Sequence, residues 1–248
     1  MARRNLLIAL AGLLAAAASP ALAGQTQVAV AANFTAPAKE IAAAFKAKTG
    51  DEAALSFGAS GQFYAQMQQG APYQVFLSAD ADRPKAAVEA GLAVADSRFT
   101  YAIGKLVLWS KSLDLAKGDE TLKANAFAKL SIANPKSAPY GAAAIEAMIK
   151  LGVYDPIQPK IVQGASIAQA FEFVDTGNAE LGFVALSQLA NVTAGSRWLV
   201  PAALYAPIRQ DAVLLKTAAD DEASKAFLAF LKGPEARAII EKYGYSLE

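Results

Sequence analysis

The chain has 248 residues, with 23 Lys and Arg against 22 Asp and Glu, and it contains neither Cys nor His. This balance of charge gives no electrostatic case for a nucleic acid or an anionic membrane as partner. The missing residue types exclude a disulfide framework, a Cys or His metal site, and any catalytic triad that uses His as its base.

The N-terminus has the pattern of a secretory signal. Arg3 and Arg4 precede an apolar run over 6–18, and the Ala-Leu-Ala sequence at 21–23 matches a small-x-small cleavage site. We therefore predict that residues 1–23 are a signal peptide and that the mature protein is exported to a bacterial periplasm. The alternative is an uncleaved membrane anchor, for which the apolar run is short. Without the two arginines, 21 basic and 22 acidic residues give the mature chain a net charge of −1.

Apolar periodicity predicts strands that alternate with helices along the mature chain. The expected strands cover 27–31, 53–57, 73–77, 100–109, 129–133, 160–162, 181–185 and 212–215. The first expected helix begins near Pro37. The other expected helices cover 61–69, 83–90, 141–150, 166–177, 222–232 and 235–243. Such alternation predicts an α/β fold with mixed, mostly parallel sheets that helices flank on both faces.

The alternation occurs in two runs, about 27–110 and 129–186, which predicts two lobes. We assign 24–103 and 213–248 to the first lobe and 104–212 to the second. The chain is then expected to cross between the lobes near 100–112 and 204–214. Ligands of open α/β sheets bind beyond the carboxyl ends of the strands, so we expect a ligand cleft between the lobes.

Four strand ends share one local pattern, in which an apolar strand gives way to small or polar residues and a helix begins. These junctions surround Asn33, Ser60, Tyr140 and Ser166. Helix starts present unpaired backbone N–H groups and the positive end of the helix dipole. Several of them converging would bind a small oxyanion without any basic side chain.

Each of these residues also has a purely structural interpretation. Asn33 and Ser60 are either donors to a ligand or caps of their own helices. Tyr140 is either a phenol that donates to an oxyanion or a packed loop residue. Ser166 begins the capping box Ser-Ile-Ala-Gln, so its side chain is expected to serve its own helix and to leave the Ile167 N–H for an anion.

Other polar residues are weaker candidates. Asp80 and Asp82 form a carboxylate pair near a strand end, which suits general acid–base chemistry but more often caps a helix such as the one expected from Arg83. Lys105 either reaches the cleft or is solvated. No nucleophile and base are paired in the sequence, which argues against an enzyme.

Several short motifs follow one another along nearly all of the mature chain. They are Ala31-Ala-Asn-Phe-Thr35, Phe57-Gly-Ala-Ser-Gly61, Val75-Phe-Leu-Ser-Ala-Asp80, Ile132-Ala-Asn-Pro135 with Pro139-Tyr-Gly141, and Glu180-Leu-Gly-Phe-Val-Ala185. In these motifs the chain resembles the molybdate-binding periplasmic proteins of ABC transporters.

The resemblance implies a two-lobed type II periplasmic binding fold that holds molybdate or tungstate through neutral donors. It implies a monomer that passes its ligand to a membrane permease with its ATPase, without a cofactor, a bare metal ion or catalysis. The family's ligand positions correspond to Asn33, Ser60, Tyr140 and the Ile167 amide, with Ala32, Ala59 and Ser166 as further candidates. The alternatives are a binder of sulfate, phosphate or chromate, and a periplasmic enzyme on the same fold.

The sequence departs from the family pattern at three alanines. Ala32 stands where relatives often have Ser or Thr, Ala59 replaces a frequent Ser, and Ala185 stands where one branch has a ligand Tyr. With fewer hydroxyl donors, Tyr140 is expected to matter more than in relatives with a fuller set. Molybdate and sulfate are both tetrahedral dianions, so the size of the pocket must separate them.

Overall fold

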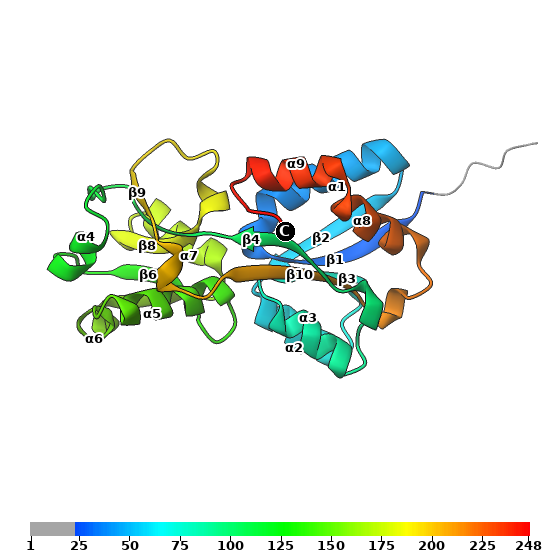
Figure 1. The fold of residues 1–248 in the computed structure, drawn as a ribbon, viewed down its shortest axis with the longest axis horizontal. Helices are drawn as coiled ribbons and strands as arrows, with labels where there is room; N and C mark the ends of the chain where they lie inside the picture. The colour runs from blue at the N-terminus through cyan, green and yellow to red at the C-terminus, as the bar shows by residue number, and fades with distance from the viewer. Residues whose placement is uncertain (1–22) are drawn as a thin grey trace, which may run out of the picture.

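The computed structural model describes residues 23–248, so the predicted signal peptide lies outside the described residues except for its last position. Two five-stranded sheets lie side by side along the long axis of the molecule, each with helices on both faces (Figure 1). This arrangement confirms the two-lobed α/β fold expected from the sequence. Within residues 23–248, no helix has the length and apolar character that a membrane span requires.

The first sheet has the strand order β2-β1-β3-β10-β4. β1 runs parallel to β2 and β3, whereas β10 runs antiparallel to β3 and β4. Its strands are β1 (Gln25–Ala31), β2 (Glu52–Gly58), β3 (Val75–Leu77), β4 (Phe99–Gly104) and β10 (Ile208–Leu214).

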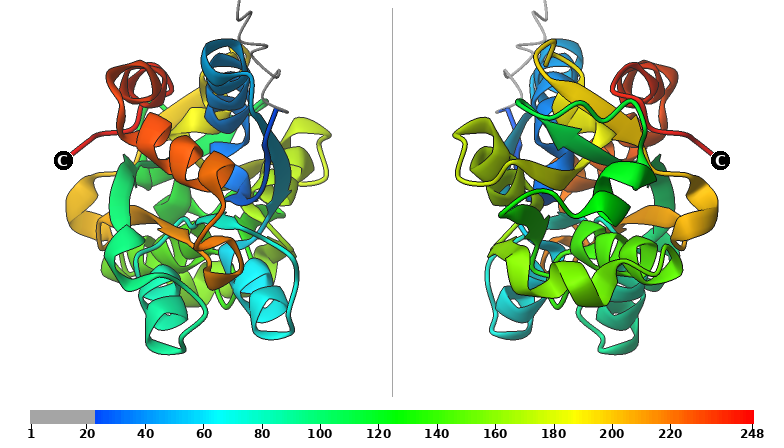
Figure 2. Two further views of the ribbon diagram at one scale, coloured as in Figure 1. Left: turned by 90° about the vertical axis from the view of Figure 1, so that its right-hand side faces the viewer. Right: turned by 90° about the vertical axis from the view of Figure 1, so that its left-hand side faces the viewer.

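Five helices cover this first sheet: α1 (Thr35–Thr49), α2 (Ser60–Gln68), α3 (Asp82–Glu89), α8 (Glu222–Lys232) and α9 (Pro234–Lys242). Figure 2 shows α2 and α3 on the opposite side of the sheet from α1 and α9. The helix α1 forms where predicted, because Ile41 and Phe45 are fully buried on one of its faces. It ends at Gly50, whose φ of 83° provides the left-handed cap that Gly adopts at little cost.

The second sheet repeats this topology with the order β7-β6-β8-β5-β9. Its strands are β5 (Leu106–Ser110), β6 (Leu130–Ala133), β7 (Ile161–Gly164), β8 (Leu181–Ala185) and β9 (Ser196–Leu199). β6 runs parallel to β7 and β8, and β5 runs antiparallel to β8 and β9. Its helices are α4 (Asp119–Ala124), α5 (Pro139–Lys150), α6 (Tyr154–Ile157) and α7 (Ile167–Asp175). The sequence analysis did not predict β9, α4 or α6, which are short and partly exposed.

The strand predicted over 100–109 is in fact two strands in different sheets. β4 pairs with β10 in the first sheet, and β5 pairs with β8 and β9 in the second, with Lys105 between them. The apolar residues on both sides of Lys105 predict buried strands. They do not indicate which sheet each strand joins. The chain therefore passes from the first sheet to the second at Lys105.

The second crossing leads into β10, which begins at Ile208 and lies wholly in the first sheet. The expected lobe boundary between residues 212 and 213 therefore falls inside a strand. The sequence analysis placed the start of this strand at Ala212, because Gln210 and Asp211 interrupt the apolar pattern. Both residues are nevertheless buried. Following the sheets, we propose that the first lobe comprises 24–104 and 208–248 and that the second comprises 105–207.

Candidate functional site

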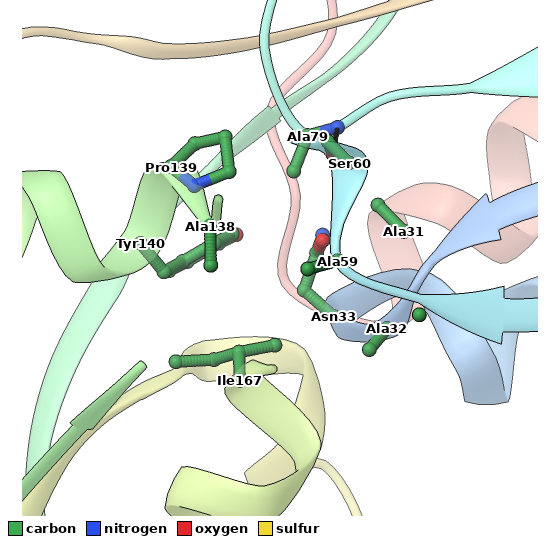
Figure 3. Close-up of a pocket in the computed structure, with 11 residues that line it drawn as sticks. Ala31, Ala32, Asn33, Ala59, Ser60, Ala79, Ala138, Pro139, Tyr140 and Ile167 are labelled. Atoms are coloured by element: carbon green, nitrogen blue, oxygen red, sulfur yellow. Dashed lines mark hydrogen bonds between the residues drawn. The ribbon is translucent and has the colours of Figure 1, made fainter. Parts of the chain in front are cut away.

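The four predicted strand-to-helix junctions meet at one small pocket between the lobes. Figure 3 shows Tyr140 and Ile167 of the second lobe facing Asn33, Ala59 and Ser60 of the first. The pocket is small, with an empty volume of about 200 Å³ that includes space open to solvent. Its lining residues are Ala31, Ala32, Asn33, Gly58, Ala59, Ser60, Ala79, Ala138, Pro139, Tyr140 and Ile167.

All eleven lining residues are uncharged, so any attraction for an anion comes from dipoles and hydrogen bonds. Ser60 and Ile167 are the first residues of α2 and α7, and Tyr140 is the second residue of α5. Backbone N–H groups at these positions have no partner inside their own helix. Each helix start acts as about half a positive charge, so these three offer roughly +1.5 before screening.

The Ser60 hydroxyl is directed at the pocket rather than at its own helix. The N-cap of α2 is Ala59, and the Ser60 Oγ accepts a hydrogen bond from the Ala79 N–H at 2.9 Å. Ser60 is only 1% exposed, and within residues 23–248 no acceptor is found for its hydroxyl hydrogen. The capping interpretation of Ser60 is therefore wrong, and its hydrogen is available to a ligand.

The Tyr140 hydroxyl is arranged in the same way. Its oxygen accepts a hydrogen bond from Gln210 Nε2 at 3.2 Å, which leaves its own hydrogen to donate. Burial raises the pKa of the Tyr140 phenol well above its ordinary value, and the neighbouring Tyr245 and Tyr101 raise it further. The phenol is therefore protonated, and able to donate, throughout the physiological pH range.

Asn33 lines the pocket, but its side-chain amide is used inside the protein. Its Nδ2 donates to Gln210 Oε1 at 2.8 Å and to the Tyr245 hydroxyl at 2.9 Å. No side-chain hydrogen bond caps α1 or the preceding 3-10 turn, Ala32–Phe34, so Asn33 is not a helix cap. With both amide hydrogens engaged, the group that Asn33 can offer a ligand is its backbone N–H.

The junction before α7 behaves as the capping box predicted. Ser166 is the N-cap, and its side chain accepts from the Gln169 N–H at 3.4 Å. Ser166 is not among the lining residues, whereas Ile167 is. The serine therefore serves its own helix, and the neighbouring Ile167 lines the pocket.

The alanines noted in the sequence fall into two groups. Ala32 and Ala59 line the pocket, so each contributes a methyl group where a Ser or Thr would contribute a hydroxyl. Ala185 is fully buried at the end of β8 and does not line the pocket. The available side-chain donors are thus the hydroxyls of Ser60 and Tyr140.

Sequence analysis missed a buried polar group behind the pocket. Gln210, on β10, accepts from Asn33 and from the Tyr101 hydroxyl, at 2.8 and 3.1 Å, and donates to Tyr140. Tyr245, near the C-terminus, bonds to the Asn33 side chain. Gln210 lies between Arg209 and Asp211, so the sequence showed it only as one of three consecutive polar residues, and no local pattern marked Tyr245.

Hydrogen bonds between the lobes enclose the pocket on two sides. The Gly61 N–H of α2 donates to the Ser137 carbonyl at 2.9 Å, and Arg83 donates to the Lys136 carbonyl at 3.1 Å. On the other side, Ser187 Oγ donates to the Asn33 carbonyl at 2.8 Å. Nine of the eleven lining residues are buried, whereas Gly58 and Pro139 are partly exposed.

Among the other polar candidates, Asp80 has structural contacts. Asp80 accepts from the Arg83 N–H at 3.0 Å and forms an ion pair with the Arg83 side chain, so it stabilises the start of α3. Over residues 23–248, no three side chains among His, Cys, Asp and Glu are grouped as a metal site requires.

Comparison with known proteins identifies the family. The model of bacterial extracellular solute-binding proteins matches residues 26–246. The chain belongs to this family. The pocket between the lobes thus lies in a solute-binding protein.

Two relatives within the family align over nearly their whole length. The molybdate-binding protein of Rhodobacter capsulatus is 61% identical over 93% of this chain and 92% of its own. The molybdate-binding protein of Azotobacter vinelandii is 55% identical over 98% of both chains. A solved structure of an Azotobacter vinelandii periplasmic molybdate-binding protein superposes with a TM-score of 0.86 at 42% identity, covering 90% of this chain and 99% of that one.

Proposed function

We propose that this protein captures molybdate, and also tungstate, outside the cytoplasm and delivers it to an ABC permease. The observation that carries the proposal is the uncharged pocket at which four strand-to-helix junctions converge. The names of the two relatives, at 61% and 55% identity, give the chemical identity of the ligand. The proposed contacts are the hydroxyls of Ser60 and Tyr140 and the backbone N–H groups of Asn33 and Ile167.

The donors suit an anion that carries no hydrogen of its own. Ser60 Oγ already accepts from Ala79, and the Tyr140 hydroxyl already accepts from Gln210, so both present hydrogens to the pocket. Monohydrogen phosphate would need an acceptor for its own hydrogen, and a buried donor without an acceptor costs about 1–3 kcal/mol. This favours fully deprotonated tetrahedral dianions over phosphate.

Sulfate has the same charge and shape as molybdate, so discrimination must come from size. A pocket whose donors are spaced for the larger anion leaves some of them unpaired around a smaller one. The methyl groups of Ala32 and Ala59 add no donors that would compensate for this loss. Molybdate and tungstate are therefore expected to bind more tightly than sulfate.

The remaining parts of the proposal concern the cellular setting. The signal predicted over 1–23 directs the chain to the periplasm, where it acts as a monomer. Its partner is a membrane permease with an attached ATPase. The use of neutral donors suits a carrier, because release of the anion requires no ion pair with a basic side chain to break.

The test is a titration of the mature protein with molybdate, tungstate, sulfate, phosphate and chromate by thermal shift and calorimetry. A ligand at a thousandfold excess over its Kd stabilises the folded state by roughly 4 kcal/mol. We expect molybdate and tungstate to raise the melting temperature and sulfate and phosphate to do little. Equal shifts for sulfate and molybdate would contradict the selectivity, and turnover of generic esters or phosphoesters would favour an enzyme instead.

A further inference from the structure

We propose that Gln210 is a positioning residue, which turns the hydroxyl hydrogen of Tyr140 into the pocket and thereby makes Tyr140 a donor to the oxyanion. The inference rests on the proposed function, because it explains how the same pocket presents its donors. Gln210 does not line the pocket and does not contact the ligand site itself. It lies behind the site on β10, fully buried, and bonds to residues of both lobes.

The argument begins at three oxygens next to the pocket, the Asn33 carbonyl, Ser187 Oγ and the Tyr245 hydroxyl. These oxygens lie 2.8–2.9 Å from one another, which makes three contacts. The two hydroxyls supply only two hydrogens for them. One atom of the Asn33 side-chain amide also lies 2.9 Å from the Tyr245 oxygen. Since no hydroxyl hydrogen is left for this contact, that atom must be a donor, so it is Nδ2.

The orientation of Asn33 fixes that of Gln210. The Asn33 Nδ2 also lies 2.8 Å from Gln210, and an NH₂ group can only donate, so the Gln210 atom there is Oε1. The Gln210 NH₂ must then point the other way, and it lies 3.2 Å from the Tyr140 hydroxyl. The Tyr140 oxygen accepts this hydrogen, so the phenol hydrogen is free to donate, and we infer that an anion in the pocket accepts it.

Gly104 makes room for this contact. A Cβ placed on Gly104 would lie 2.0 Å from the Tyr140 hydroxyl and 2.7 Å from Gln210 Nε2. The φ of Gly104 lies outside the left-handed region, so no backbone strain calls for glycine at this position. The space that glycine leaves on β4 is filled by the hydrogen bond between Gln210 and Tyr140.

Gln210 differs from an ordinary core residue because the direction of its amide matters, and not only its volume. If Gln210 were oriented the other way, its Oε1 would accept the Tyr140 hydrogen and the pocket would lose one of its two hydroxyl donors. The direction of the amide thus decides whether Tyr140 presents a hydrogen or a lone pair to an anion. Each group fixes the orientation of the next, in the order Tyr245, Asn33, Gln210 and Tyr140.

The test is a double-mutant cycle on the Kd for molybdate, with tungstate as a second probe. Gln210→Met keeps the side-chain length and removes the amide, and Tyr140→Phe keeps the ring and removes the hydroxyl. We expect Tyr140→Phe to weaken binding about 10- to 100-fold, as for loss of a hydrogen bond to a charge. Gln210→Met should weaken it at least about 5-fold in the parent but less than about 2-fold in Tyr140→Phe, because coupled residues are not additive.

Gln74→Met is the matched control. The Gln74 side chain accepts the Gln27 N–H at 2.7 Å in the first sheet, away from the pocket. This variant removes a structural amide of the same size and should leave the Kd unchanged. If Gln74→Met weakens binding as much as Gln210→Met, the effect of Gln210 is general and the inference is overturned. Equal effects of Gln210→Met in the parent and in Tyr140→Phe overturn it as well.

Gln210→Glu, measured both in the parent and in Tyr140→Phe, adds a second readout, because direct repulsion between a carboxylate and the anion is common to the two backgrounds. The groups that face residue 210 are Asn33, Tyr101, Tyr140 and Tyr245, all neutral, and the adjacent Asp211 is paired with Arg98. A carboxylate there would accept the Tyr140 hydrogen, whereas a protonated carboxyl can donate. We expect the affinity of Gln210→Glu, relative to the parent at the same pH, to recover as the pH falls from 8.5 to 5.5. A constant ratio across this range, or an equal recovery in Tyr140→Phe, would overturn the inference.

The outcomes separate this inference from the proposed function. A parent protein that binds none of the oxyanions overturns the proposed function, and the inference with it. A parent that binds molybdate while Gln210→Met and Gln210→Glu bind equally well overturns the inference alone. If Gln210→Met does not fold, the pH series on Gln210→Glu decides by itself.

Discussion

Gly61 lies where the two lobes touch, and its replacement by Ala tests whether that contact stabilises the ligand-bound form. The Gly61 N–H donates to the Ser137 carbonyl of the other lobe at 2.9 Å. A Cβ on Gly61 would lie 2.9 Å from Ser137 Cα, 3.0 Å from its carbonyl oxygen and 3.1 Å from Arg83 Nε. These distances are too short for a methyl group unless the lobes move apart.

The same substitution is harmless to the helix in which it is made. Gly61 is the second residue of α2, and its φ is not in the left-handed region. Ala is favoured over Gly in a helix by up to about 1 kcal/mol. In the lobe contact, crowding of this kind costs about 1–3 kcal/mol. We therefore expect Gly61→Ala to weaken molybdate binding by about 5- to 150-fold, since each 1.4 kcal/mol is tenfold in Kd.

The measurement is calorimetric titration with molybdate, together with denaturant unfolding of the unliganded protein. Gly233→Ala is the matched control, because its Cβ would meet the Phe230 carbonyl at 3.1 Å within the first lobe, far from the pocket. This control should leave the Kd unchanged. An unaltered Kd for Gly61→Ala would refute the reasoning. So would a loss of unliganded stability equal to the loss of affinity, because the contact would then hold the lobes together without ligand.

Two further predictions concern the buried hydroxyls. Ser60→Ala should weaken molybdate binding, and it should also lower the free energy of unfolding by about 1–3 kcal/mol, because the Ala79 N–H loses its acceptor; unchanged affinity in calorimetry would show that Ser60 serves the fold only. Burial raises the pKa of Tyr245 to about 12. Since the unfolded chain then loses this proton first, the free energy of unfolding should fall as the pH rises from about 10 to 12, by about 2–3 kcal/mol in all. The free energy of unfolding of Tyr245→Phe, measured by urea titration, should fall less steeply over this pH range. An identical slope would contradict the assignment.

The sequence by itself determined the four helix starts and their chemistry. The reason is that a helix start depends on a few adjacent residues, such as the capping box at Ser166 or the small residues on either side of Ser60. The absence of Cys and His likewise excluded whole classes of site without any fold. The alternation of strands and helices in two runs predicted the two lobes, which the comparisons and the sheets confirm.

Only the tertiary structure decided which hydrogens face the pocket. The side chain of Asn33 is bonded to residues 177 and 212 positions away, Gln210 and Tyr245, and no local pattern reports such partners. The same holds for Ser60, whose capping role was locally plausible until Ala79, 19 positions away, supplied the hydrogen that its oxygen accepts. Hydrogen-bond direction depends on the groups that packing brings together, and packing joins strands that lie far apart in the chain. The sequence therefore marked the residues around the anion, and the assembled lobes set what each one donates.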